Sequence, residues 1–157
     1  MRPTRQFLFA HPAHFLALGF GSGRAAIAPG TWGTLAAFPL YFLLSAAGGA
    51  FYWLGTGLAL IAGIWICDKT GRALGVHDYG GIVWDEIAAF LLVLPFAPPT
   101  WWGYLLAFLL FRLFDIWKPF PIAWCDGHMK GGFGVMFDDI LAAGYSNLCL
   151  WGVSQWL

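Results

Sequence analysis

Five apolar stretches, each about 16 to 18 residues long, occupy more than half of this chain. They cover residues 32–47, 51–67, 82–97, 100–117 and 140–157. Hydrophobic residues make up 60% of the sequence and charged residues only 10%, whereas soluble domains carry about 25% charged residues. Too little polar sequence remains to cover a soluble core. The pattern predicts an integral membrane protein, an all-α bundle with four to five short spanning helices. One or two of the five stretches fit a buried or half-inserted helix equally well.

The length of 157 residues predicts one membrane-embedded domain that includes the whole of 1–157. Arg2 and Arg5 precede an apolar segment, 7–20, which Pro12 interrupts. This segment is typical of a helix in the membrane interface and not of a cleaved signal peptide. Eight Lys and Arg balance eight Asp and Glu, so no excess positive charge is available to bind nucleic acid.

The charges predict an orientation in the membrane. The loops 48–50 and 98–99 carry no charge, and with five spans every Lys and Arg falls on the opposite side. The excess of basic residues in cytoplasmic loops makes that side cytoplasmic. All eight carboxylates fall on the same side or just within it. This one-sided arrangement favours a reaction site at the interface over a transport pathway through the membrane.

Two pairs of acids lie at the starts of apolar stretches. Asp85 and Glu86 open the third stretch, and Asp138 and Asp139 precede the last one, after a glycine-rich segment. Ionisable residues at such positions are expensive to bury and indicate function. Together with Asp115 they form a set of oxygen ligands suited to a hard cation, and Mg²⁺ prefers carboxylates, waters and substrate phosphate.

Three further charges close the fourth stretch. Arg112, Asp115 and Lys118 follow one another at intervals of three residues, so we expect each neighbouring pair to meet along one helix surface. Pro119 ends that helix. Three charges among aromatic residues exceed what a single structural ion pair needs, which indicates a functional site.

A glycine-rich segment, 19–34, contains Arg24, Thr31 and Thr34. Such a loop can present successive N–H groups to an anion, and either threonine is suited to cap the first span. The segment lacks the lysine of a nucleotide-binding P-loop. His77 and His128 lie beside acids and are candidates for proton transfer, although unassigned loop histidines fit the pattern equally well.

Four blocks of this sequence, 28–34, 77–86, 111–121 and 132–139, resemble the phosphatidylglycerophosphatase A family of bacterial membrane lipid phosphatases. The resemblance covers nearly the whole chain. It implies a multi-pass protein of the bacterial inner membrane that removes the terminal phosphate of phosphatidylglycerophosphate with Mg²⁺, yielding phosphatidylglycerol. The implied active site faces the cytoplasm, and the implied partner is the phospholipid substrate.

The residues and the resemblance together give a set of expected roles. The expected catalytic residues are Asp85, Glu86, Asp115 and Asp139. The expected ligands of Mg²⁺ are Asp85, Glu86, Asp138 and Asp139. The expected phosphate-binding residues are Arg24, Thr31, Arg112 and Lys118. Whether water or an aspartate attacks phosphorus stays open, as does the oligomeric state.

Two other functions fit parts of the sequence. An ion-coupled membrane transporter or channel can use the same carboxylates, but it predicts ionisable groups at mid-membrane and a two-halved internal repeat, which the sequence lacks. A lipid phosphotransferase is suggested by Asp126 and Gly127, but the residues that should follow them in that motif are absent.

Overall fold

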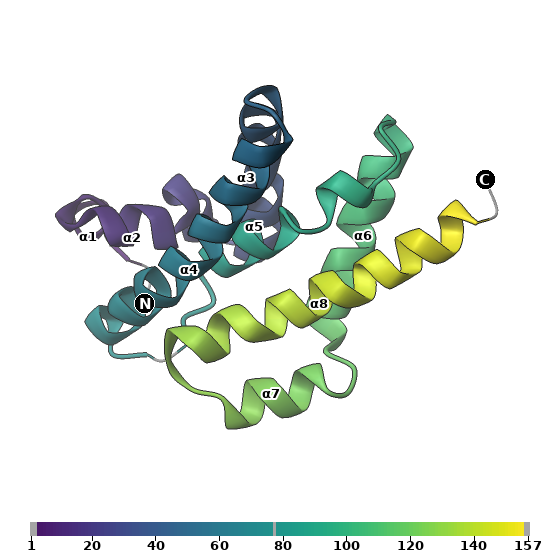
Figure 1. The fold of residues 1–157 in the computed structure, drawn as a ribbon. Helices are drawn as coiled ribbons and strands as arrows, with labels where there is room; N and C mark the ends of the chain where they lie inside the picture. Colours follow the sequence, from purple (N-terminus) through teal and green to yellow (C-terminus); the bar gives the residue numbers. More distant parts are fainter. Residues whose placement is uncertain (1–2, 77, 156–157) are drawn as a thin grey trace.

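The computed structural model describes residues 3–76 and 78–155, and all regular secondary structure within them is helical. The α-helices are α1 (Arg5–Ala10), α2 (Pro12–Ala17), α3 (Pro29–Ala46), α4 (Gly49–Leu74), α5 (Trp84–Phe90), α6 (Trp101–Trp117), α7 (Ile122–His128) and α8 (Gly131–Ser154). Two 3₁₀ segments, η1 (Gly19–Arg24) and η2 (Leu94–Phe96), complete the order shown in Figure 1. The prediction of an all-α fold is confirmed.

Four of the five apolar stretches form long helices, which are α3, α4, α6 and α8. The third stretch, 82–97, does not form a single helix. Its helix α5 has seven residues, or about 10 Å at 1.5 Å per residue, far less than a bilayer core of about 30 Å. It is apolar because other helices bury it: Phe90 and Ile87 are fully buried. This stretch is therefore the buried kind of helix that the prediction of four to five spans allowed for one or two of the five stretches.

Side chains of neighbouring helices complete the hydrogen bonds of α5 at its C-terminal end. The hydroxyl of Tyr52 in α4 donates to the carbonyl oxygen of Leu91 at 2.5 Å. The amide of Asn147 in α8 donates to the carbonyl oxygen of Leu92 at 3.0 Å. A helix end buried without partners is costly, so these two bonds allow a short helix to stop inside the bundle.

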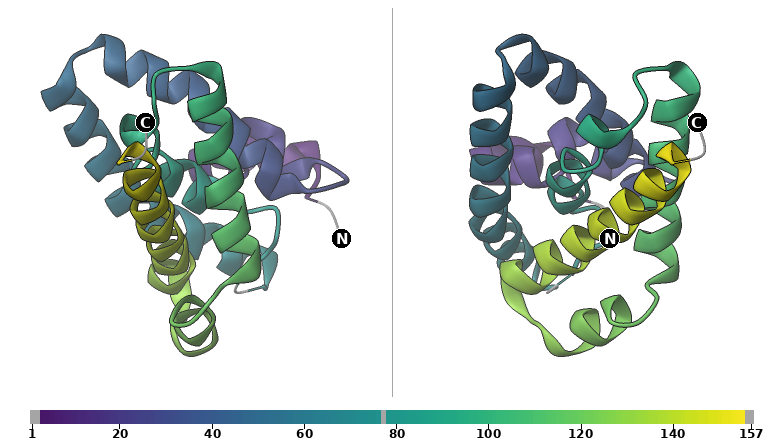
Figure 2. Two further views of the ribbon diagram at one scale, coloured as in Figure 1. Left: turned by 90° about the vertical axis from the view of Figure 1, so that its right-hand side faces the viewer. Right: turned by 45° about the vertical axis from the view of Figure 1, so that its right-hand side comes forward.

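The long helices meet at points where side chains are small. In α8, Gly132 lies against the carbonyl group of Ile64 in α4, and a Cβ atom at Gly132 would overlap with it. The helix α8 also packs on α5, α6 and α7. Figure 2 shows α8 passing alongside α6 and close to α4. This packing brings the start of α5, the end of α6 and the first turns of α8 together.

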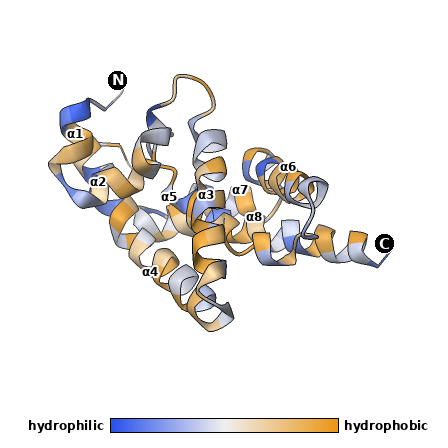
Figure 3. Ribbon diagram, turned by 90° about the horizontal axis from the view of Figure 1, so that it is seen from above, coloured by the Kyte–Doolittle hydropathy of each residue, from blue (hydrophilic) through white to orange (hydrophobic). Residues whose placement is uncertain are grey.

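Many large apolar side chains point outward from the long helices. Leu43 of α3, Ile61 of α4, Trp101 of α6 and Trp151 of α8 are each more than 65% exposed. Figure 3 shows hydrophobic residues along these helices. Within the described residues, α4 is the one helix long and apolar enough to cross a membrane by length and composition. The bundle with four to five spans stays a prediction.

The N-terminal segment folds as two short helices and not as a span. The helix α2 packs on α4, where His14 Nδ1 and Thr70 Oγ1 lie 2.9 Å apart in a buried hydrogen bond. Phe9 of α1 is 71% exposed. The expected position of this segment in the membrane interface stays a prediction.

Candidate active site

The first turn of α5 carries Asp85 and Glu86, and two hydrogen bonds fix where that turn begins. The backbone N–H of Val83 donates to the carbonyl oxygen of Ala17 at 2.8 Å. The indole of Trp84 donates to the carbonyl oxygen of Ala59 in α4 at 3.0 Å. The two acids are therefore held from α2 and α4, and Asp85 is only 8% exposed.

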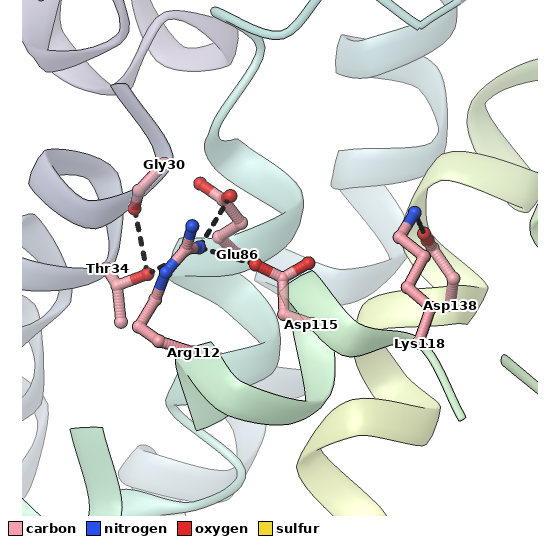
Figure 4. A network of polar contacts seen from close by, with 7 residues as sticks. All are labelled: Gly30, Thr34, Glu86, Arg112, Asp115, Lys118 and Asp138. Atoms are coloured by element: carbon pink, nitrogen blue, oxygen red, sulfur yellow. Dashed lines mark hydrogen bonds and ion pairs between the residues drawn. The ribbon is translucent and has the colours of Figure 1, made fainter. Parts of the chain in front are cut away.

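Arg112 joins α5 to α6 through one amino group. Its Nη1 donates to Glu86 Oε1 at 2.8 Å and to Asp115 Oδ2 at 2.5 Å. The same nitrogen lies 3.5 Å from the hydroxyl oxygen of Thr34 in α3 (Figure 4). The predicted pair of Arg112 and Asp115 along one helix surface is confirmed.

Lys118 does not continue along the same helix surface. It has φ 47° and ψ 59°, in the left-handed region that ends α6. Its Nζ turns toward α7 and α8, where it donates to Asp138 Oδ2 at 2.6 Å and lies 3.1 Å from Asp126 Oδ1. Burial opposes the charged ammonium group, but the bonds to Asp138 and Asp126 raise the pKa of Lys118 above its ordinary value. The expected pairing of Lys118 with Asp115 is wrong because the helix ends before it can form.

These side chains surround a polar cavity of about 150 Å³ between α5, α6 and α8. Its lining residues are Asp78, Gly80, Ile82, Asp85, Glu86, Asp115, Lys118, Val135, Asp138 and Asp139. The structure thus brings together all five acids that the sequence singled out, from three separate motifs. It adds Asp78, and Lys118 is the cation that lines the cavity.

The three other expected phosphate-binding residues do not line this cavity. Arg24 donates through its Nε to the carbonyl oxygen of Pro3 at 3.0 Å. Thr31 lies partly buried in the first turn of α3. Arg112 lies behind the cavity wall, bound to Glu86 and Asp115, which form that wall.

Three buried carboxylate oxygens have no hydrogen-bond partner within the part of the chain that the structure describes. They are Asp85 Oδ1, Glu86 Oε2 and Asp138 Oδ1. Buried polar atoms are almost always paired in folded proteins, so unpaired oxygens on side chains that line a cavity are available to water or to a bound cation. Burial and then the charge of Glu86 raise the pKa of Asp85. Burial and the nearby Asp115 raise the pKa of Glu86 to about 7, although Arg112 opposes this.

The donor set fits a hard cation. Six carboxylates line the cavity with one lysine, and an added positive charge would relieve their mutual repulsion. Across residues 3–76 and 78–155, no three His, Cys, Asp or Glu side chains are already grouped so that they could hold a metal ion. Mg²⁺ does not need such a group, since one or two carboxylates usually bind it together with waters and substrate phosphate.

Sequence reasoning missed several residues of this site. Asp126 was considered only as part of a phosphotransferase motif, yet it is a partner of Lys118. Thr34 was a candidate helix cap and part of the family block 28–34, and the sequence did not show that it contacts Arg112. The sequence also proposed two histidines for proton transfer. The Nδ1 of His128 lies 2.8 Å from the carbonyl oxygen of Trp124, and His128 does not line the cavity. His77 lies outside the described residues.

Comparisons with known proteins assign the chain to a family. The family model described as phosphatidylglycerophosphatase A matches residues 15–154. The phosphatidylglycerophosphatase A of Haemophilus influenzae is 44% identical over 157 residues, covering 99% of this chain and 96% of that protein. The protein of the same name from Escherichia coli is 43% identical over 134 residues, covering 85% of this chain and 78% of that protein.

A third relative has a different name. The putative phosphatidylinositol-3-phosphatase of Bacteroides thetaiotaomicron is 39% identical over 149 residues, covering 88% of this chain and 91% of that protein. No solved structure matches the chain. The helical fold, the acidic cavity and these likenesses define a membrane-associated enzyme of the phosphatase class. The chain belongs to the phosphatidylglycerophosphatase A family.

Proposed function

We propose that this chain hydrolyses the terminal phosphomonoester of phosphatidylglycerophosphate to phosphatidylglycerol and phosphate, with Mg²⁺, at the cytoplasmic face of the bacterial inner membrane. The observation that carries the proposal is the cavity in which Lys118 meets five acids from three motifs of the family resemblance. The names of the Haemophilus and Escherichia relatives support the substrate. The family gives no support to the alternative, an ion-coupled transporter or channel.

The residues of the cavity divide into two roles. Lys118 lines the cavity and would meet the phosphate oxygens, where fixed positive charge stabilises the charge that develops in phosphoryl transfer. Asp85, Glu86, Asp138 and Asp139 are the candidate ligands of Mg²⁺, of which one or two would bind it together with waters and substrate phosphate. Asp115, on the same wall, would orient a water molecule. Bound Mg²⁺ would polarise the phosphoryl group and favour formation of the nucleophile.

The substrate and the metal can be tested together with purified protein in detergent. Phosphate release is measured from phosphatidylglycerophosphate and from phosphatidylinositol 3-phosphate, each with Mg²⁺ and with excess EDTA. We expect release from phosphatidylglycerophosphate at least tenfold faster, and its loss with EDTA. Equal rates of phosphate release with Mg²⁺ and with EDTA would contradict the proposed dependence on Mg²⁺. Faster release from phosphatidylinositol 3-phosphate would favour the activity named for the Bacteroides relative.

The proposed membrane arrangement has α3, α4, α6 and α8 crossing the bilayer and α5 entering it only partway. The outward apolar side chains of the four long helices support this arrangement, since soluble monomers rarely expose large apolar patches. In Figure 1 the connection from α3 to α4 lies at the top, near the level where α6 begins, and α7 lies at the bottom. The uncharged loops are therefore at the end of the bundle opposite α7.

Cysteine labelling of intact cells tests this topology. In a variant without Cys67, Cys125 and Cys149, a cysteine is placed at Gly49 or at Gly127, both of which are exposed. We expect a membrane-impermeant thiol reagent to label position 49 and not position 127, because basic loops resist translocation. Permeabilised cells, in which both positions should react, are the control. Labelling of position 127 from outside would place the cavity on the wrong side of the membrane.

A further inference from the structure

The carboxylate of Glu86 occupies space that α3 leaves open by lacking side chains. A Cβ atom at Gly30 would overlap with Oε1, Oε2 and Cδ of Glu86, which are its three nearest neighbours. One turn further along, a Cβ atom at Gly33 would lie 3.1 Å from Glu86 Oε2 and against the side chain of Val83. Both glycines are buried in the first turns of α3. Glu86 can reach its present position only because neither residue has a side chain.

Thr34 continues the same surface of α3 toward Arg112. Its hydroxyl is fully buried and donates to the carbonyl oxygen of Gly30 at 2.9 Å. Its oxygen also lies 3.5 Å from Nη1 of Arg112, the nitrogen that binds Glu86 and Asp115. One amino group therefore has acceptors on α3, α5 and α6, as Figure 4 shows.

Arg112 and α3 contact two of the acids on the cavity wall, and the charge of Arg112 also acts on a third acid, Asp139. None of Gly30, Thr34 and Arg112 lines the cavity, whereas Glu86 and Asp115 do. The Nε of Arg112 is buried without a hydrogen-bond partner in the described chain, so the position of the guanidinium depends on its Nη1 contacts. A shift of Glu86 at the glycines would therefore move two of the acids on the cavity wall.

We propose that Gly30, Gly33 and Thr34 are positioning residues, which seat Glu86 on Arg112 and so hold the Glu86 and Asp115 carboxylates on the cavity wall. Arg112 then acts as the centre of this network and not as a direct phosphate ligand. The kinetic test of this proposal rests on the proposed function, and a thermal test does not.

The kinetic test compares two substitutions of one buried hydroxyl. Thr34→Val removes the hydroxyl and keeps the shape, and should lower kcat about tenfold with little change in KM, because Lys118 is untouched. Thr34→Ser keeps the hydroxyl and should restore kcat to within about twofold of the wild type. Rescue by serine separates the hydrogen bonds from simple packing. Equal kcat values for valine and serine would overturn the role of Thr34.

The thermal test measures the coupling between Gly30 and Glu86 by the unfolding temperature, Tm, in detergent. Gly30→Ala should lower Tm in the wild type, because the new methyl group meets the Glu86 carboxylate. In a Glu86→Ala background, where those atoms are gone, the same substitution should change Tm far less. The control is Gly57→Ala in α4, whose Cβ would contact nothing within 4 Å, and which should leave Tm and kcat near those of the wild type.

The outcomes of the thermal test decide whether Gly30 positions Glu86, whether or not the protein has the proposed activity. Equal decreases in Tm in the two backgrounds, or failure of Gly30→Ala to fold in both, would overturn the proposal. Failure to fold only when Glu86 is present supports it. If the wild-type protein released no phosphate, the proposed function would fail, and the thermal coupling would still show whether α3 seats Glu86.

Discussion

Asp139→Asn is expected to reduce the hydrolysis of phosphatidylglycerophosphate by more than about 100-fold, since the loss of an outer partner of a metal ligand alone typically costs about 10- to 100-fold. Asp139 is 2% exposed and lines the cavity. The substitution keeps the size of the side chain and removes one negative charge from a crowded acidic cluster, so the protein should still fold. The measurement is kcat/KM over a range of Mg²⁺ concentrations.

Asp68→Asn provides the matched control for that substitution. Asp68 is a carboxylate of α4 that pairs with Arg72 at 2.9 Å and does not line the cavity. Its loss should leave turnover near that of the wild type. If Asp139→Asn kept near-normal turnover at limiting Mg²⁺, Asp139 would not be a ligand.

Lys118→Met should lower kcat by about 10²- to 10³-fold, the usual cost of removing one preorganised donor to a developing negative charge. It should also raise KM, because the ammonium group meets the phosphate before the reaction as well. Lys118 is the cation on the cavity wall, held 2.6 Å from Asp138 Oδ2. Steady-state kinetics with phosphatidylglycerophosphate give both parameters.

Lys69→Met is the control for this second substitution. Lys69 lies over the ring of Trp65 at 5.2 Å from its centroid, away from the cavity lining. Its loss should change kcat less than twofold. A Lys118→Met protein that is folded and keeps the wild-type kcat would show that Lys118 only balances the charge of Asp138 and Asp126.

The sequence identified the acidic cluster because carboxylates beside apolar stretches stand out. Asp85, Glu86, Asp115, Asp138 and Asp139 lie in three motifs, and burying such groups without function is costly. The structure brings all five to one cavity. Their roles as ligands or catalytic groups remain predictions.

The spacing of residues in the sequence was not enough to predict which acids Arg112 and Lys118 contact. Intervals of three residues place Asp115 and Lys118 on one surface only if the helix continues, and Lys118 leaves it with a φ of 47°. Arg112 binds Glu86, which lies 26 residues away along the chain. Local patterns do not contain such contacts between helices.

Hydropathy also did not distinguish an apolar segment that spans a membrane from one that other helices bury. Residues 82–97 are as apolar as a short span, but helix α5 is enclosed by protein. Likewise, the sequence does not show that Gly30 and Gly33 make room for Glu86. Both features depend on the neighbours of a segment, which are set by the tertiary fold.

The central claim is that the cavity between α5, α6 and α8 removes phosphate from a phospholipid. The most direct test follows phosphatidylglycerophosphate by mass spectrometry in lipid nanodiscs that contain the purified protein and Mg²⁺. The wild type should convert it to phosphatidylglycerol with one phosphate released per lipid, and a folded Asp85→Asn, Asp139→Asn double variant should leave it unchanged. Intact substrate with the folded wild type, or conversion by the double variant at the wild-type rate, would contradict the claim.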